Sequence, residues 1–196
     1  CQYNASLIFH KLAVNAAVHT PIMGSGAFDP LLHLCAADNL ATQRQAAAAL
    51  RDLCSNKELK VGIADGGGIQ TLVMLNKQFD LELRTLATGA LRHLSVASLV
   101  QKPVIQAEAL YPIIKNICEL QRQQPSVDLM RQSAACLANL SENTENQVTM
   151  IKQGAFAALN ELVLMEHIDT RVDAGRAFSH ISANPENHTG VFSSDE

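Results

Sequence analysis

One regularity constrains this chain more than any other: an apolar residue that closes a helical stretch recurs at a nearly constant interval. The residues at this position are Leu12, Leu53, Leu94, Leu140 and Ile181. They are 41, 41, 46 and 41 residues apart. Self-similarity at a period of about 20–50 residues is typical of chains that stack similar structural units instead of folding around one central core. We call these five residues the anchors and number the positions of each repeat from them.

Each anchor ends one apolar face of a predicted helix. Positions −7, −4, −3 and 0 lie on the same side of an α-helix. Position −7 carries small residues, and position −3 carries large ones, which lets a neighbouring helix approach closely while the space between is filled. The residues at −7 are Ala5, Ala46, Ala87, Ser133 and Ala174. Those at −4 are Ile8, Ala49, Ala90, Cys136 and Ala177, and those at −3 are Phe9, Leu50, Leu91, Leu137 and Phe178.

A second pattern follows the anchors at fixed distances, and each of its two features follows four of the five. An Asn three residues later predicts the cap of a short helix, and a Gly fourteen residues later predicts its end. Apolar residues after that Gly predict a middle helix. The Asn residues are Asn15, Asn56, Asn143 and Asn184, and the turn position carries Gly26, Gly67, Glu108 and Gly154. The apolar residues of the middle helix include Phe28, Leu31, Ile69, Leu72, Leu110, Ile113, Phe156 and Leu159.

Each unit therefore consists of a short, a middle and a long final helix, and in this it resembles the armadillo repeat. The segments 66–73 with 84–94, and 143–156, carry this resemblance. It implies an all-α fold, an α-α superhelix of about four armadillo repeats plus partial flanking units, with residues 1–196 as a single array. The third interval is longer because of extra residues between Ile113 and Arg131, where 119–126 predicts a longer middle helix and a Gln-rich loop that is a candidate second contact surface.

The two ends of the chain predict partial units. Residue 1 falls within a final helix, and the segment near Val191-Phe192 falls within a short first helix. Solenoids need polar capping repeats, and neither end resembles one. We expect the chain to be a fragment of a longer array.

Composition narrows the classes of function. Hydrophobic residues make up 47% and aromatic residues 4%, with no Trp, so Ala and Leu build the core. The net charge of −4 gives no broad electrostatic footprint for nucleic acid or an anionic membrane. No apolar run is long enough to insert in a bilayer, and no secretory signal is visible, although a lipidated terminus elsewhere stays open. Five cysteines without metal-like pairing predict small core residues in a cytoplasmic, reducing setting.

The resemblance also implies where a partner binds. In armadillo folds the final helices line a concave groove, whose exposed positions are −1, −5 and −9 in this frame. Position −1 carries Lys11, Asp52, His93, Asn139 and His180, and position −5 carries Leu7, Ala48, Gly89, Ala135 and Arg176. Position −9 carries Tyr3, Arg44, Thr85, Arg131 and Val172, with Arg51 and Arg92 at −2 on the margin.

Three interpretations of this groove stay open. Nuclear-import receptors grip basic peptides with Trp at −5 and Asn at −1, and only Asn139 matches, so recognition of that kind is disfavoured. A catenin-like basic groove for acidic extended ligands is supported by arginines, whose fork suits carboxylates; these are Arg44, Arg51, Arg92, Arg131 and Arg176. The same arginines could instead be ordinary solvated side chains, and the small residues Ala48, Gly89 and Ala135 could accept a partner helix.

No chemistry-bearing motif competes with this interpretation. The run 66–68 lacks the glycine spacing, the Lys and the preceding strand of a phosphate loop, so we interpret it as a turn between helices. The seven His residues form no close pair with metal-ligand spacing, and no local motif supports a Cys-His nucleophile. We expect no catalytic residue, no cofactor and no metal.

The sequence thus predicts a non-catalytic scaffold or adaptor that binds an extended peptide or helix of another protein. A place in a multi-subunit assembly stays open. An alternative is the substrate-recognition arm of a multidomain enzyme such as a ubiquitin ligase. The candidate partner-binding residues are Arg44, Ala48, Arg51, Asp52, Gly89, Arg92, His93, Arg131, Ala135, Asn139, Arg176 and His180.

Overall fold

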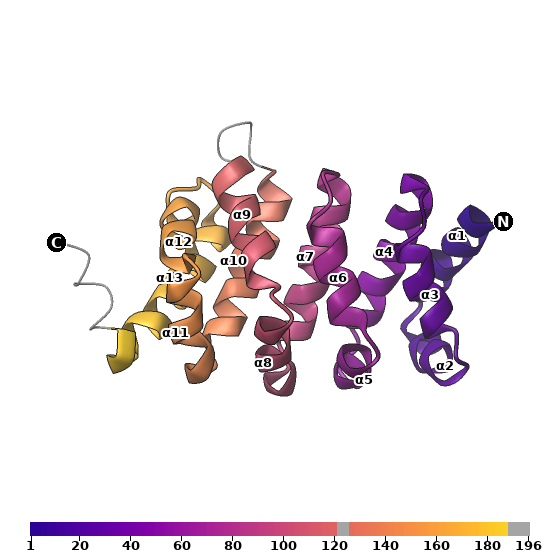
Figure 1. The fold of residues 1–196 in the computed structure, drawn as a ribbon, viewed down its shortest axis with the longest axis horizontal. Helices are drawn as coiled ribbons and strands as arrows, with labels where there is room; N and C mark the ends of the chain where they lie inside the picture. Colours follow the sequence, from indigo (N-terminus) through magenta and orange to yellow (C-terminus); the bar gives the residue numbers. More distant parts are fainter. Residues whose placement is uncertain (121–125, 188–196) are drawn as a thin grey trace.

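The computed structural model describes residues 1–120 and 126–187, which form an elongated stack of helices without a β-strand in these two ranges (Figure 1). A single helix, α1 (Gln2–Ala13), is followed by four units of similar design. The first unit contains η1 (Ala16–Val18), α2 (His19–Gly24), α3 (Phe28–Cys35) and α4 (Leu40–Cys54). The second contains α5 (Lys60–Asp65), α6 (Gly68–Asn76) and α7 (Leu81–Ser95).

The remaining units repeat this order. The third contains α8 (Ser98–Gln106), α9 (Leu110–Leu120) and α10 (Val127–Ser141). The fourth contains α11 (Thr144–Lys152), α12 (Ala155–Val163) and α13 (Ile168–Ala183), and is followed by η2 (Pro185–Asn187). The prediction of a short, a middle and a long helix in each of four units is confirmed.

The long helices pack side by side along one side of the array, in the order α1, α4, α7, α10 and α13. We call this side the third-helix face. The middle helices α3, α6, α9 and α12 lie on the opposite side, and the short first helices lie along the lower edge in Figure 1. Side chains that point outward from neighbouring long helices therefore share one surface.

The anchors show how stacking buries the core. Leu53, Leu94 and Leu140 are fully buried, whereas Leu12, at the same repeat position, is 45% exposed. The residue Ile8 on α1 is likewise 58% exposed, although its counterparts Ala49 and Ala90 are buried. A long helix is covered on both sides only where units flank it, so α1 keeps an apolar groove of about 550 Å³ toward α2. That the chain is a fragment of a longer array stays a prediction.

The predicted caps and turns are present at the predicted residues. The side-chain oxygen of each repeat Asn accepts a bond from the amide two residues later, at 3.1 Å for Asn15 and 3.0 Å for Asn56, Asn143 and Asn184. Between the short and middle helices the backbone is left-handed, with φ of 75° at Gly26 and 88° at Gly67 and Gly154. In the third unit Glu108 takes the same turn at φ 60°. The run 66–68 is the turn between α5 and α6, as predicted.

A buried polar residue seven positions after each of the first four anchors joins the short helix to the long helices. His19 Nε2 lies 2.6 Å from Ala13 O, and Gln101 Nε2 donates to Ser95 O at 3.1 Å. Gln147 Nε2 donates to Ser141 O at 2.7 Å. These three bonds reach the end of the preceding long helix. Lys60 differs, because its Nζ donates forward to His93 O, in the long helix of its own unit.

The predicted lengthening of the third unit is confirmed where the structure describes it. The middle helix of the third unit is longer, with 11 residues in α9 against 9 in α6 and α12. The candidate contact loop around 121–125 and the predicted helix near Val191-Phe192 lie outside the described residues.

Cys35, Cys54 and Cys136 are buried core residues, as expected. The prediction is wrong for Cys1 and Cys118, which are exposed because each lies on a surface that no neighbouring helix covers.

Candidate functional site

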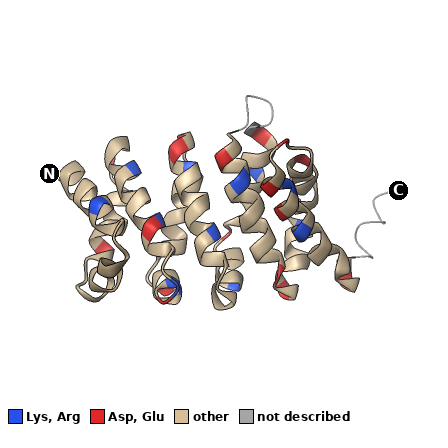
Figure 2. Ribbon diagram, turned by 180° about the vertical axis from the view of Figure 1, so that it is seen from behind, with Lys and Arg blue, Asp and Glu red and all other residues tan. Residues whose placement is uncertain are grey.

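The third-helix face carries both signs of charge, and Figure 2 shows them interspersed along the array. Four of the five arginines expected in a basic groove form ion pairs with carboxylates of the chain. The pairs are Arg44 with Asp80 and Glu82, Arg51 with Asp52, Arg131 with Asp128, and Arg176 with Asp173 and Glu142. The face is therefore a ladder of ion pairs and not a uniformly basic surface.

The pair between Arg44 and Asp80 illustrates how these arginines are used. Arg44 Nη2 and Nε lie 2.5 and 3.2 Å from the two carboxylate oxygens of Asp80, which links α4 to α7. Asp80 also caps α7 by accepting a bond from the Leu83 amide at 2.9 Å. The hydrogen bond from Arg44 holds the pKa of Asp80 below its usual value. Arg44 therefore links two neighbouring units, and its guanidinium is already paired within the chain.

Arg92 is the exception among the five. Within the described residues it has no carboxylate partner at ion-pair distance, and its Nη2 donates to His93 Nε2 at 3.1 Å. Its Nε is buried and has no hydrogen-bond partner there. Burial, followed by the nearby charge of Arg131, lowers the pKa of Arg92. A half-buried guanidinium with an unused donor is expected to seek an acceptor from outside.

His93 lies in a local excess of positive charge. Burial lowers the pKa of His93 to about 4, and the neighbouring Arg92, Lys60 and Arg51 add to the effect. The imidazole is therefore neutral at pH 7, which lets Nε2 accept the bond from Arg92.

This shift predicts a pH dependence of stability. The unfolded state takes up a proton on His93 near pH 6.5 and the folded state only near pH 4, so the unfolded state binds more protons between these values. The contribution of His93 to the free energy of unfolding is therefore fully present above pH 6.5. It is lost as the pH falls toward 4, by about 2 kcal/mol after allowance for the partial exposure of the side chain. Urea denaturation at pH 7 and pH 4.5 measures the loss. His93→Asn, which carries the residue of the next unit, should lose less, and equal losses would contradict the assignment.

Asn139, the one match to the peptide-gripping Asn of import receptors, is used inside the chain. Its Nδ2 donates to Arg92 O at 3.3 Å and to Ser95 Oγ at 3.2 Å. Its Oδ1 accepts a bond from Arg176 Nη2 at 3.1 Å. The side chain ties α10 to both neighbouring long helices and offers no free group to a ligand.

The expected floor of small residues is only partly exposed. Ala48 and Gly89 are buried, so the expectation that position −5 is open is wrong for them, while Ala135 is partly exposed. A Cβ placed on Gly89 would lie 3.6 Å from Gln132 Oε1 and 3.7 Å from Arg51 Cδ. Long side chains from the neighbouring helices fold over the small residue and cover it.

Gln132 also borders a pocket of about 290 Å³ between α7, α10 and α13, which we call the groove pocket. Gln132 Oε1 is buried there and has no partner in the described part of the chain. The pocket thus combines one unused donor, Arg92 Nε, with one unused acceptor. Its lining residues are Arg92, Arg131, Gln132, Ala135, Asp169, Val172 and Asp173.

Sequence reasoning found only part of this site. Arg92, Arg131 and Ala135 were predicted, but Gln132 and Asp173 were not. Both occupy position −8, next to the −9 position that was inspected, so a wider frame would have included them. Of the other candidates, Asp52 pairs with Arg51 and lies 4.0 Å from His10 Nε2.

His180 and Ser141 form a contact that could suggest nucleophilic chemistry. Their Nδ1 and Oγ atoms are 3.0 Å apart. The Ser141 hydroxyl, however, donates to Ala138 O at 2.7 Å and is fully buried, so its proton already has an acceptor and no substrate can approach it. Within the described residues no cluster of three or more His, Cys, Asp or Glu could hold a metal ion.

Comparison with known proteins agrees with this geometry. The model of the Armadillo/beta-catenin-like repeat matches residues 21–55. A designed armadillo repeat protein superposes with a TM-score of 0.82 at 22% identity, over 91% of this chain and 75% of that chain. The chain has the armadillo-repeat fold. A second designed armadillo repeat protein, solved in complex with the peptide (KR)4, has a TM-score of 0.82 at 19% identity and covers 96% of this chain and 81% of that one.

Natural armadillo relatives are longer than this chain. Vacuolar protein 8 of Candida albicans is 27% identical over 150 residues, which are 76% of this chain and 25% of that protein. Catenin delta-2 of Homo sapiens is 28% identical over 158 residues, or 72% of this chain and 13% of the relative. The chain therefore spans about a quarter of the first relative and about an eighth of the second. In the ranges 1–120 and 126–187, no armadillo helix has both the length and the apolar character required to span a bilayer.

Proposed function

We propose that this armadillo array is a non-catalytic scaffold that binds an extended segment of another protein along its third-helix face. The observation that carries the proposal is the groove pocket, which is lined by both Arg92 and Gln132. Each of these side chains has one buried atom, Nε of Arg92 and Oε1 of Gln132, without a hydrogen-bond partner among the described residues. A residue of an extended peptide presents its own N–H and C=O on the same side, so one residue can pair with both a donor and an acceptor. Unsatisfied buried polar groups are costly, which favours a ligand that pairs them.

The charges of the pocket favour the main chain over a charged side chain as the group that is held. Arg92 and Arg131 line the pocket together with Asp169 and Asp173. Because both signs of charge are present, the pocket favours neither a carboxylate nor a cation. The proposal therefore differs from the basic groove for acidic ligands considered from the sequence, because the other arginines already have carboxylate partners. Their exposed ion pairs contribute little to stability and can open at the rim of a bound peptide.

The similar designed armadillo protein that was solved with a peptide supports a peptide as the ligand class. An adaptor role within a larger cytoplasmic assembly is part of the proposal, since the natural relatives continue well beyond the matched region. The recognition arm of a ubiquitin ligase stays the alternative, and it would use the same face.

The test begins with selection of binding peptides from a random dodecapeptide library displayed on phage. The dissociation constant of a selected peptide is then measured by fluorescence anisotropy for the wild-type chain and for Arg92→Met and Gln132→Leu. We expect each variant to weaken binding at least about tenfold, since a hydrogen bond of about 1.4 kcal/mol is lost.

Lys115→Met, on the middle helix α9 of the opposite side, is the matched control and should bind as the wild type does. Selection of no peptide above an empty-phage background would contradict the scaffold. Equal binding by Arg92→Met, Gln132→Leu and wild type would contradict the role of the groove pocket.

A further inference from the structure

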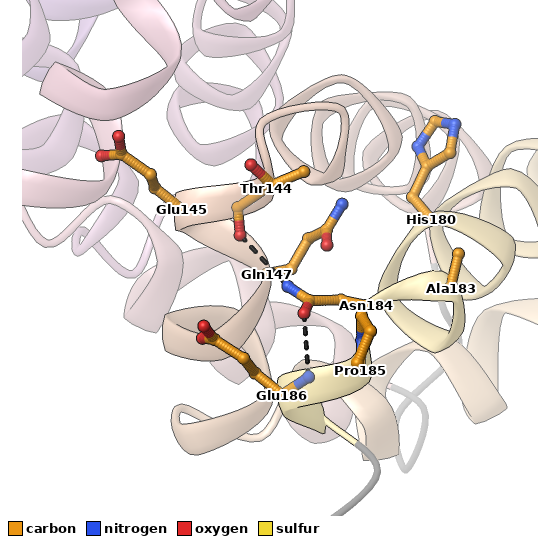
Figure 3. A pocket seen from close by; sticks show the side chains of 8 residues that line it. All are labelled: Thr144, Glu145, Gln147, His180, Ala183, Asn184, Pro185 and Glu186. Atoms are coloured by element: carbon orange, nitrogen blue, oxygen red, sulfur yellow. Dashed lines mark hydrogen bonds between the residues drawn. The ribbon is translucent and has the colours of Figure 1, made fainter.

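A second pocket, of about 340 Å³, lies near the other end of the fourth unit, between α11, the end of α13 and η2 (Figure 3). We call it the edge pocket. Residues from both ends of the unit line it, with Thr144, Glu145 and Gln147 on one side and His180, Asn184 and Glu186 on the other. None of these residues lines the groove pocket, so the edge pocket is a separate site.

Gln147 places an unused acceptor in this pocket. The residue is only 4% exposed, and its Nε2 donates to Ser141 O at 2.7 Å. Its Oε1 is buried and has no partner among the residues that the structure describes. Figure 3 shows the amide extending into the space between the segments that carry Thr144 and His180. A ligand in this space must therefore supply a donor.

The second unit shows what kind of donor fits. Lys60 occupies the repeat position of Gln147, and His93 occupies that of His180. The Lys60 ammonium crosses from the short helix to the His93 carbonyl of the long helix. Gln147 is shorter and bonds backward to the preceding long helix, so in the fourth unit the corresponding space is left open. The chain itself thus contains an ammonium group at the equivalent place.

The charges around the edge pocket favour the same group. Glu145 and Glu186 both line it, and no Lys or Arg does. Lys102 pairs with Glu145 at 2.6 Å, without being one of the lining residues. Asn184 is committed to the wall, because its Nδ2 donates to Thr144 O at 3.4 Å and its Oδ1 accepts a bond from the Glu186 amide at 3.0 Å (Figure 3). The lining of the edge pocket therefore includes hydrogen-bond acceptors and two acidic residues.

From this we infer that the edge pocket binds a primary ammonium group, carried by a lysine side chain of a partner peptide or by a free alkylamine. The ammonium donates to Gln147 Oε1 and takes the place in the fourth unit that the Lys60 ammonium takes in the second. Glu145 and Glu186 balance its charge. The inference does not depend on the groove pocket.

The experiment is a titration of the ¹⁵N-labelled chain with n-butylammonium chloride, followed by the tripeptide Ac-Ala-Lys-Ala-NH₂. We expect saturable chemical-shift changes at the Gln147 side-chain amide, Thr144 and His180. The tripeptide with norleucine in place of Lys is the control for apolar contact and should give no saturable change. Tighter binding of the lysine tripeptide than of butylammonium indicates a peptide source, and equal binding indicates a free amine.

Two variants of Gln147 keep the test decisive. Gln147→Leu should weaken ammonium binding at least about tenfold, whereas Gln101→Leu, at the same position of the third unit, should leave it unchanged. Gln147→Lys should place an ammonium in the cavity as Lys60 does, so that binding is lost while the thermal midpoint rises. The inference is overturned if wild type shows no saturable change, if norleucine gives the same change as Lys, or if Gln147→Lys still binds butylammonium.

Discussion

Leu94→Ala lowers the free energy of unfolding by about 3–4 kcal/mol, because it empties a fully buried site in the middle of the array. Leu94 closes the core face of α7, a long helix that packs against both α4 and α10. Neighbouring units hold this site from both sides, so it cannot collapse to refill the cavity. Urea denaturation followed by circular dichroism measures the loss.

Leu12→Ala is the matched control, because Leu12 occupies the same repeat position but is 45% exposed. We expect a loss of about 1 kcal/mol or less, since little apolar surface is returned to water. Equal losses at the two positions would show that the interface between units does not determine the stability of α7. A change in the slope against urea would indicate that single units unfold separately, as repeat arrays can.

Gly68→Ala lowers the free energy of unfolding by about 3 kcal/mol through a steric clash. A Cβ on Gly68 would lie 2.5 Å from Ile63 Cγ2 and 2.6 Å from Ile63 O. The backbone oxygen cannot turn aside as the end of a side chain can, so α5 and α6 must move apart. The same denaturation measurement gives the size of the effect.

Two other glycines separate the clash from the loss of backbone freedom. Gly154→Ala meets no atom within 4 Å but must keep a φ of 88°, so it should cost about 1 kcal/mol. Gly62→Ala sits inside α5 with its nearest contact at 3.9 Å and should be neutral or stabilising by up to about 1 kcal/mol. If Gly68→Ala costs no more than Gly154→Ala, close packing is not the reason for glycine at position 68.

The two pockets suit different ligand groups and lie in different parts of the array. The groove pocket lies among the long helices and offers a donor and an acceptor, which suits a peptide group. The edge pocket lies at the short-helix edge and offers acceptors and carboxylates, which suits an ammonium. A partner segment that contains a lysine has groups that suit both pockets. The Gln132 variant tests the groove pocket and the Gln147 variants test the edge pocket.

The repeat frame predicted the fold because its signals are local. The stripe that ends at Leu53, the cap at Asn56 and the left-handed turn at Gly67 each depend on residues a few positions away, and each is present in the structure. Glu108 stands where the other units have Gly, yet its position in the repeat still predicted a turn, and the structure has one there. Periodicity and capping depend on neighbours a few residues away, and a single sequence displays those directly.

The candidate site was predicted less well, because its properties come from side chains of neighbouring units. Arg44 was expected to be free for a ligand, but it pairs with Asp80, 36 residues later. Asn139 matched a known peptide-gripping position, yet it bonds to Arg92 O, 47 residues earlier. Such partners cannot be identified from spacing, since several polar residues lie at suitable positions in each unit.

The sequence by itself determined the all-α repeat architecture, the boundaries of the units and the apolar face of every long helix, because these follow from helical periodicity and from local cap and turn residues. Only the tertiary structure decided which polar residues remain available to a ligand. Lys60 and Gln147 occupy the same repeat position, but one crosses the gap to the next long helix and the other turns back. That difference depends on side-chain length and on the distance between packed helices, which the order of residues does not state.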